Sequence, residues 1–268
     1  MLWNAKNGSV PVDDTTMQYV CFGHGEKNFV ILPGLSDGLT TVKGKAVMLA
    51  KPYQKFFDHY TVWMFSRKDE LPQGCTIREM AADQAAAMEA LGIEKASVMG
   101  VSQGGMIAQY LAIDHPKLVE KLVLAVTAPQ VNDMILDAVG GWMELAEKGD
   151  HKQLMIDTAE KSYSPAYLKK YRKLYPLLGH LGKPKDYRRF LANARAILGF
   201  DALEDLERIA CPVLILAGEE DRIVGAEASF AMQKKIPGSR LHVYKGLGHA
   251  AYEEAEDFNE RVLRFLEE

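Results

Sequence analysis

The chain has few cysteines and no recognisable spacing among them. Cys21, Cys75 and Cys211 are odd in number and widely separated, with no Cys-x-x-Cys pair and no histidine at a spacing typical of zinc sites. This pattern excludes a disulfide-stapled scaffold and favours free, structural thiols. We therefore expect no metal site and no cofactor.

The chain also lacks long apolar runs and a large excess of charge of one sign. No apolar stretch approaches the roughly 20 residues of a membrane-spanning helix, and the opening residues MLWNAKNG contain no signal-peptide core. The formal net charge of -4 offers no general attraction to nucleic acid or to an anionic membrane. We expect a cytoplasmic protein whose partner is a small-molecule substrate, with no nucleic-acid or membrane partner, and the sequence leaves its oligomeric state open.

The remaining composition is that of a globular protein: 268 residues, 48% of them hydrophobic, suffice for one core with an inserted lobe. Apolar segments suited to strands occur at residues 18–22, 28–32, 61–65, 96–100, 121–126, 212–217 and 240–244. Helical patterns occur at residues 76–91, 103–114 and 254–266. This alternation predicts an α/β fold with a mostly parallel central sheet flanked by helices.

One long segment interrupts the alternation. From about residue 131 to residue 200 only helical patterns occur, punctuated by glycine and proline. We predict a core of residues 1–129 and 201–268 and a helical cap of residues 130–200. Because parallel sheets bind ligands beyond the carboxyl ends of their strands, this cap is placed to roof a pocket. Trp142, Met143 and Tyr163 are candidate lining residues, with packing between helices as the alternative.

A short motif indicates catalysis. Ser102 lies between Gly100 and Gly104 in the sequence GVSQGG, directly after an apolar run and before a helical pattern. A serine on such a tight strand-to-helix turn is held in strained backbone geometry that exposes its hydroxyl, and the glycines give the turn room. Taken alone, the five-residue pattern also fits an ordinary glycine-bearing turn.

A serine nucleophile needs a base, because its hydroxyl is not ionised at neutral pH. Asp221 follows the apolar segment 212–217, and His249 follows the segment 240–244. In hydrolases with this turn the chain order is serine, then acid, then histidine, and this chain keeps that order. Each residue comes after the carboxyl end of a predicted strand, so all three are expected at one edge of the sheet. Glu219 and Glu220 remain alternative acids.

With these residues in place, the chain resembles the α/β-hydrolase family, in its cap-bearing branch of carboxylesterases, enol-lactonases and carbon–carbon bond hydrolases. The resemblance rests on four motifs in order: LPGLSDG from residue 32, GVSQGG, IACPVLILAGEED from residue 209, and IPGS followed by GLGH. It implies Ser102 as nucleophile, His249 as general base and Asp221 as the orienting carboxylate. It also implies an oxyanion hole formed by the backbone N–H groups of Leu35 and Gln103.

The chain departs from the family pattern in three places. Pro33 stands where many members have histidine, so the support of the oxyanion loop is open. A charged segment, residues 66–70, replaces a frequent glycine-rich loop, and we read it as a loop without an assigned role. Basic residues cluster between positions 169 and 189, either as a solvated helix face or to steer a carboxylate-bearing substrate. The serine nucleophile argues against the family's aspartate-using dehalogenases and epoxide hydrolases.

These observations predict a cofactor-free serine hydrolase that cleaves a small ester, thioester or lactone through an acyl-enzyme on Ser102. Two alternatives stay open. The same residues support hydrolysis of a carbon–carbon bond next to a ketone, and a receptor that binds a ligand without turnover keeps the same fold.

Overall fold

An eight-stranded sheet runs through the computed structural model, which describes residues 2–268. Its order is β1-β2-β4-β3-β5-β6-β7-β8. The strands are β1 (Lys6–Val12), β2 (Thr15–Gly23), β3 (Lys27–Leu32), β4 (Tyr60–Lys68), β5 (Ala96–Val101), β6 (Val119–Ala125), β7 (Val213–Gly218) and β8 (Arg240–Tyr244). From β4 to β8 all neighbours are parallel, whereas β2 pairs antiparallel with β1 and β4. The predicted mostly parallel α/β sheet is confirmed, and β1 is an additional edge strand.

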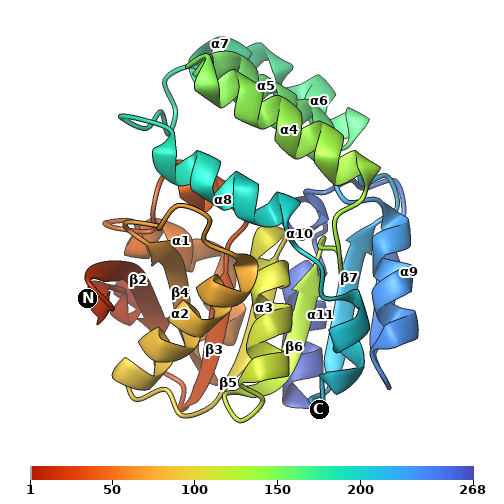
Figure 1. The fold of residues 1–268 in the computed structure, drawn as a ribbon. Coiled ribbons are helices and arrows are strands. Elements are labelled where there is room, and N and C mark those ends of the chain that lie inside the picture. Colours follow the sequence, from red (N-terminus) through yellow and green to blue (C-terminus); the bar gives the residue numbers. More distant parts are fainter. Residues whose placement is uncertain (1) are drawn as a thin grey trace.

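Helices cover both faces of this sheet (Figure 1). They are α1 (Ala46–Ala50), α2 (Ile77–Ala90), α3 (Gln103–Asp114), α9 (Ala226–Lys235), α10 (Ala251–Glu254) and α11 (Phe258–Glu267). One buried apolar cluster joins the sheet to α2, α3 and α9, and a second joins it to α1, α11 and the 3₁₀ helix η3 (Lys51–Phe56). Within residues 2–268, none of the helices has the length and apolar character that crossing a bilayer requires.

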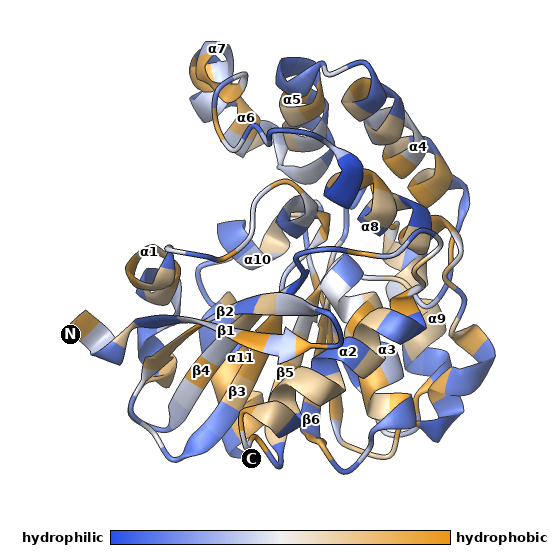
Figure 2. Cartoon of the chain, turned by 60° about the vertical axis from the view of Figure 1, so that its left-hand side comes forward, coloured by the Kyte–Doolittle hydropathy of each residue, from blue (hydrophilic) through white to orange (hydrophobic). Residues whose placement is uncertain are grey.

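Local sequence explains the main elements. Helix α2 begins with a capping box, in which the Thr76 hydroxyl accepts the Glu79 N–H and the Glu79 carboxylate accepts the Thr76 N–H. Strand β3 passes from the hydrophilic Lys27 and Asn28 to four buried apolar residues, a change that Figure 2 shows along the strand. Its apolar carboxyl-terminal half lies under helices on both faces, as expected of a central parallel strand.

The predicted helix over residues 254–266 is wrong at its beginning. The chain forms α10, becomes extended at Ala255 and starts α11 at Phe258. No glycine or proline marks this break. The Glu254 carboxylate instead accepts hydrogen bonds from the backbone N–H and hydroxyl of Ser164, at 2.9 and 2.5 Å, which hold α10 against a distant segment. A tertiary contact therefore accompanies a break for which the local sequence gives no signal.

Residues 133–198, here called the insertion, form helices above the carboxyl ends of the strands (Figure 1). These helices are α4 (Asp133–Glu147), α5 (His151–Ser162), α6 (Pro165–Tyr171), α7 (Tyr175–Leu178) and α8 (Arg188–Leu198). The segments that lead into and out of the insertion meet at a β-bridge between Gln130 and Asp201. Beside it, the Ala202 N–H donates to the Pro129 carbonyl at 2.8 Å. The insertion thus leaves and re-enters the core at one point.

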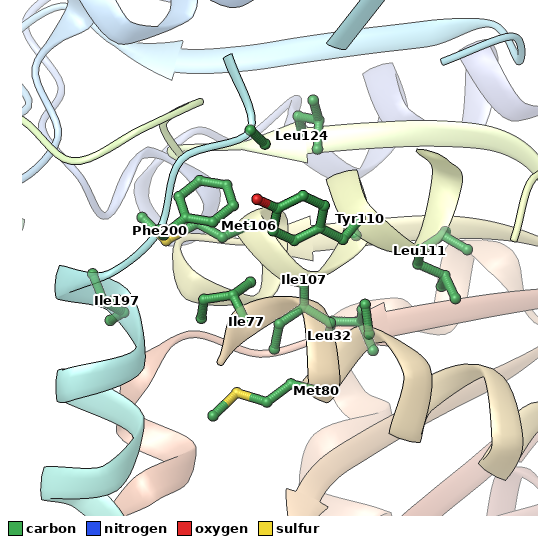
Figure 3. Close-up of a cluster of buried hydrophobic side chains, with 14 of the residues drawn as sticks. Leu32, Ile77, Met80, Met106, Ile107, Tyr110, Leu111, Leu124, Ile197 and Phe200 are labelled. Atoms are coloured by element: carbon green, nitrogen blue, oxygen red, sulfur yellow. The ribbon is translucent and has the colours of Figure 1, made fainter. Parts of the chain in front are cut away.

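The last helix of the insertion packs into the core of the sheet domain. Ile197 of α8 belongs to the same buried cluster as Met106 and Tyr110 of α3. Figure 3 shows Phe200, two residues after the end of α8, beside Met106 and Tyr110. The rings of Tyr110 and Phe200 lie edge to face with centroids 5.5 Å apart, and the Tyr110 hydroxyl donates to the Asp201 carbonyl at 2.5 Å. Helix α8 is therefore fixed to α3, the helix that begins next to Ser102.

Candidate active site

Ser102 occupies the turn between β5 and α3. Its backbone has φ 54° and ψ −120°, a strained conformation for a residue with a Cβ. Two contacts hold this conformation: the Ser102 N–H donates to the Ala125 carbonyl at 2.9 Å, and the Thr127 hydroxyl donates to the Ser102 carbonyl at 2.7 Å. The role of Thr127 was not apparent from the sequence, because a threonine after a strand carries no distinctive pattern.

The glycines around Ser102 are required by close packing. A Cβ on Gly100 would lie 2.3 Å from the Gly104 carbonyl oxygen, and a Cβ on Gly104 would lie 1.9 Å from the Leu32 carbonyl oxygen. Both distances are far inside van der Waals contact. Glycine at position 100 therefore lets β5 approach the start of α3, and glycine at position 104 lets α3 approach the end of β3.

Asp221 and His249 are directly hydrogen-bonded. Asp221 Oδ2 lies 2.7 Å from His249 Nδ1, and both side chains are buried. The other carboxylate oxygen, Oδ1, accepts the N–H groups of Ile223 at 2.8 Å and Val224 at 3.0 Å. Burial alone would raise the pKa of Asp221, but His249 and these two donors outweigh it and lower that pKa. The carboxylate is thus held anionic beside the imidazole.

The alternative acids do not reach the histidine. Glu219 and Glu220 are exposed, and the Glu219 carboxylate accepts the Gly246 N–H at 3.0 Å. Among the three neighbouring carboxylates, Asp221 alone bonds to His249 within residues 2–268.

Ser102 and the Asp221–His249 pair share one edge of the sheet. They follow β5, β7 and β8, which are parallel members of the run β5-β6-β7-β8. No hydrogen bond joins Ser102 to His249 among the described residues, and such bonds in free enzymes are often formed only with substrate present. The Ala250 N–H, next to His249, donates to the Ser162 carbonyl at the end of α5 at 2.8 Å. The histidine loop is therefore attached to the insertion.

Two backbone N–H groups lie close to Ser102 in the fold. Leu35 begins the 3₁₀ helix η2 (Leu35–Gly38) and Gln103 begins α3. N–H groups at the start of a helix have no partner within it, and neither of these two donates a hydrogen bond to another group within residues 2–268. A Cβ on Gly34 would lie 3.4 Å from Ser102 Cβ, so the η2 loop touches the serine.

The loop that the sequence suggested at residues 66–70 is confirmed only for Asp69 and Glu70, which lie in a bend, and is wrong for residues 66–68. Ser66, Arg67 and Lys68 end strand β4 and are buried. The Arg67 guanidinium donates to the Gln103 side-chain carbonyl at 2.7 Å, while the Arg67 backbone N–H donates to Asp37 Oδ2 at 3.0 Å. Burial lowers the pKa of Arg67 to about 10, so it stays cationic at neutral pH.

Asp37 lies in η2, two residues after Leu35, so this network supports the loop in which Pro33 supplies neither a side-chain bond nor a backbone donor. Such a network carries no sequence signal because its partners lie on separate elements.

The network also includes one residue of the basic cluster between positions 169 and 189. Arg189 of α8 donates to Asp37 Oδ2 at 2.7 Å and to the Arg67 carbonyl at 2.9 Å. Arg189 is therefore an anchor between the insertion and the core, and the solvated-face reading does not hold for it.

The three proposed pocket residues have different surroundings. Trp142 is buried, and its indole N–H donates to the Asp157 carboxylate of α5 at 2.8 Å, so it packs α4 against α5. Met143 is half-buried against the same apolar cluster. The Tyr163 hydroxyl reaches the core, where it donates to the Glu253 carboxylate of α10 at 2.6 Å.

Comparison with known proteins identifies the family of this chain. The family model described as alpha/beta hydrolase fold matches residues 52–256. The chain belongs to this family. It is 29% identical over 201 residues to a 2-hydroxy-6-oxononadienedioate/2-hydroxy-6-oxononatrienedioate hydrolase of Pseudomonas sp, covering 70% of each chain. It is 22% identical over 259 residues to 3-oxoadipate enol-lactonase 2 of Acinetobacter baylyi, covering 95% of this chain and 94% of the relative.

A solved structure has the same fold. The enol-lactonase from Burkholderia xenovorans LB400 superposes with a TM-score of 0.81 at 21% sequence identity, covering 97% of this chain and 100% of that one. This α/β hydrolase is therefore a hydrolytic enzyme by family, and its relatives differ in the bond that they cleave.

Proposed function

We propose that this α/β hydrolase is a serine hydrolase that cleaves a small ester, thioester or lactone. The observation that carries the proposal is the buried hydrogen bond between Asp221 and His249, at the same sheet edge as the strained Ser102. A carboxylate on Nδ1 fixes the imidazole tautomer that leaves Nε2 free to accept a proton.

In the proposed reaction, Ser102 Oγ attacks the substrate carbonyl while its proton passes to His249 Nε2. The negative charge on the carbonyl oxygen is stabilised by the N–H groups of Leu35 and Gln103. His249 then gives its proton to the leaving alcohol, thiol or lactone oxygen, which leaves an acyl-enzyme. Water attacks this ester with His249 as base, and the acid product departs from the regenerated Ser102.

The test combines turnover with covalent labelling. We expect the protein to hydrolyse p-nitrophenyl butyrate and a fluorophosphonate probe to attach to Ser102, with the adduct located by peptide mass spectrometry. Ser102→Ala should abolish both, and Ser239→Ala, an exchange at a distant serine, should abolish neither. Labelling and turnover that persist in Ser102→Ala would refute the assignment of the nucleophile. A folded protein without turnover of esters, thioesters or lactones would refute the proposed reaction.

A further inference from the structure

A cavity of about 590 Å³ lies beside Ser102. It is lined by the loop after β3, by α1 and η3, and by α10 and α11. Two of its lining residues adjoin the serine: Val101 precedes it in the chain, and a Cβ on Gly34 would lie 3.9 Å from Ser102 Oγ. The volume falls within the range of small-molecule sites.

The inner wall of this cavity is apolar. Ile31, Met64 and Met99 line it from three neighbouring strands, and Leu49 adds to it from α1, which is hydrophobic along its whole length (Figure 2). Methionine side chains are flexible and polarisable, so they adapt to irregular apolar groups. The wall suits a hydrocarbon group of a substrate held at Ser102.

The outer rim is acidic. Among the described residues that line the cavity, Glu253 and Glu256 are the only ones with charged side chains, and neither forms an ion pair within residues 2–268. Lys55, on the neighbouring η3, is paired with Glu260 at 3.4 Å. Within the described part of the chain, residues 2–268, no lysine or arginine therefore pairs with either glutamate of the rim.

Tyrosine hydroxyls accompany Glu253. Its carboxylate accepts the Tyr163 hydroxyl at 2.6 Å, and Tyr53 and Tyr252 line the cavity. Burial, and next the charge of Glu253, raise the pKa of both Tyr53 and Tyr252. These hydroxyls stay neutral, so the carboxylates determine the charge of the rim.

We propose that this cavity selects the acyl group of the substrate, admitting apolar groups that are uncharged or cationic and rejecting those that end in a carboxylate. The proposal rests on the proposed function, because it assumes an acyl group on Ser102. Glu253 and Glu256 are exposed at the rim, so they repel a carboxylate across water, and the apolar wall adds the cost of removing water from that carboxylate. A quaternary ammonium is attracted by the same rim. Two relatives carry names that refer to carboxylate-bearing compounds, a dioate and an oxoadipate, so the proposal separates this chain from them in the charge of the acyl group.

The test uses three p-nitrophenyl esters of similar size: 5,5-dimethylhexanoate, its cationic isostere 4-(trimethylammonio)butanoate, and the mono-ester of adipate. We expect kcat/KM for the adipate ester to be at least about tenfold below that of the neutral ester, and the cationic ester to be hydrolysed at least as well as the neutral one. Raising the salt concentration from about 0.02 M to about 0.5 M should narrow the difference, because screening weakens charge repulsion and leaves steric selection unchanged.

Two kinds of variant test whether Glu253 and Glu256 cause the selection against the adipate ester. Glu253→Gln combined with Glu256→Gln should shift the ratio of neutral to adipate turnover toward one, and Glu89→Gln, an exposed exchange on α2, should leave the ratio as it is. A wild-type enzyme that hydrolyses the adipate ester as fast as the neutral ester refutes the selection. A ratio that the double variant does not move also refutes it. Either of these two results counts against the selection only if the neutral ester is hydrolysed and Ser102→Ala abolishes that hydrolysis. If the neutral ester is not hydrolysed at all, the hydrolase assignment itself is refuted.

Discussion

The backbone carbonyl of Asn193, on α8 of the insertion, accepts a hydrogen bond from the side-chain amide of Gln103 at 3.0 Å. Gln103 directly follows Ser102, and its N–H is one of the two proposed oxyanion donors. The other end of the same amide accepts from Arg67, which is linked through Asp37 to the loop of the second donor, Leu35. The insertion and both donors thus belong to one buried polar network.

This arrangement predicts that Gln103→Leu lowers kcat more than it changes KM. The variant loses the bonds to Arg67 and Asn193, so the N–H of residue 103 is no longer held toward the developing oxyanion. We expect kcat to fall by at least about tenfold, a smaller loss than complete removal of an oxyanion donor causes. KM should stay within about threefold of the parent value. Steady-state kinetics with p-nitrophenyl butyrate measure both values.

A buried glutamine on the same helix provides the control. Gln109 donates to the carbonyls of Gly105 and Ala128 but contacts neither proposed donor loop. Gln109→Leu should lower the free energy of unfolding by about 1–3 kcal/mol, as the loss of buried hydrogen bonds requires, with kcat nearly unchanged. Equal kcat values for the two variants would show that Gln103 is structural only.

The sequence predicted the parts of the site that depend on local chemistry. The Ser102 turn needs glycines within two residues, and Asp221 and His249 each follow an apolar strand, so a short window contains the signal for each. The network around Asp37, Arg67 and the insertion was not predictable, because its members are separated in the chain by 30 residues or more. Residues 66–68 appeared to be a loop for the same reason. Charged residues usually lie in solvent, but Arg67 and Lys68 are paired with aspartates that are distant in the chain.

The pair Asp221–His249 predicts a large catalytic effect of a small change. Asp221→Asn keeps the volume of the side chain but presents an amide that cannot stabilise the imidazolium, so we expect kcat to fall by as much as ~10⁴-fold. Ester hydrolysis at saturating substrate measures this. Glu219→Gln and Glu220→Gln are the matched exchanges at the two residues before Asp221 and should remain within about threefold of the parent. An inactive Glu220→Gln beside an active Asp221→Asn would reassign the acid.

The lowered pKa of Asp221 also predicts how acid affects stability. A carboxyl group whose pKa is lower in the folded state than its usual 3.8 stabilises the fold above pH 3.8, and this contribution is lost as the pH falls through the folded-state value. The free energy of unfolding should therefore decrease more steeply in the parent than in Asp221→Asn between about pH 4.5 and about pH 2.5. Urea titrations at several pH values measure the difference, which should narrow on acidification. A constant difference over this range would mean that Asp221 does not titrate with the fold.

The apolar wall of the 590 Å³ cavity predicts the preferred acyl length. Each methylene of a p-nitrophenyl ester that fits should raise kcat/KM by up to about fourfold, and kcat/KM should fall beyond about eight carbons, when the chain outgrows the cavity. Met64→Ala enlarges the cavity and should move the optimum to longer chains. Met17→Ala removes a buried methionine from β2, outside the cavity, and should lower stability with the optimum unchanged.

The same series decides the role of the insertion residues. Trp142 packs α4 against α5 and bonds to Asp157, so Trp142→Ala should cost about 3–5 kcal/mol of stability and leave the optimal chain length where it was. Met143 is half-buried in the same cluster. Met143→Ala should also leave the optimal chain length unchanged, with a smaller loss of stability than Trp142→Ala. If Trp142→Ala lengthens the preferred acyl chain while Met64→Ala does not, the acyl group lies under the insertion, and the cavity beside α1 is not its binding site.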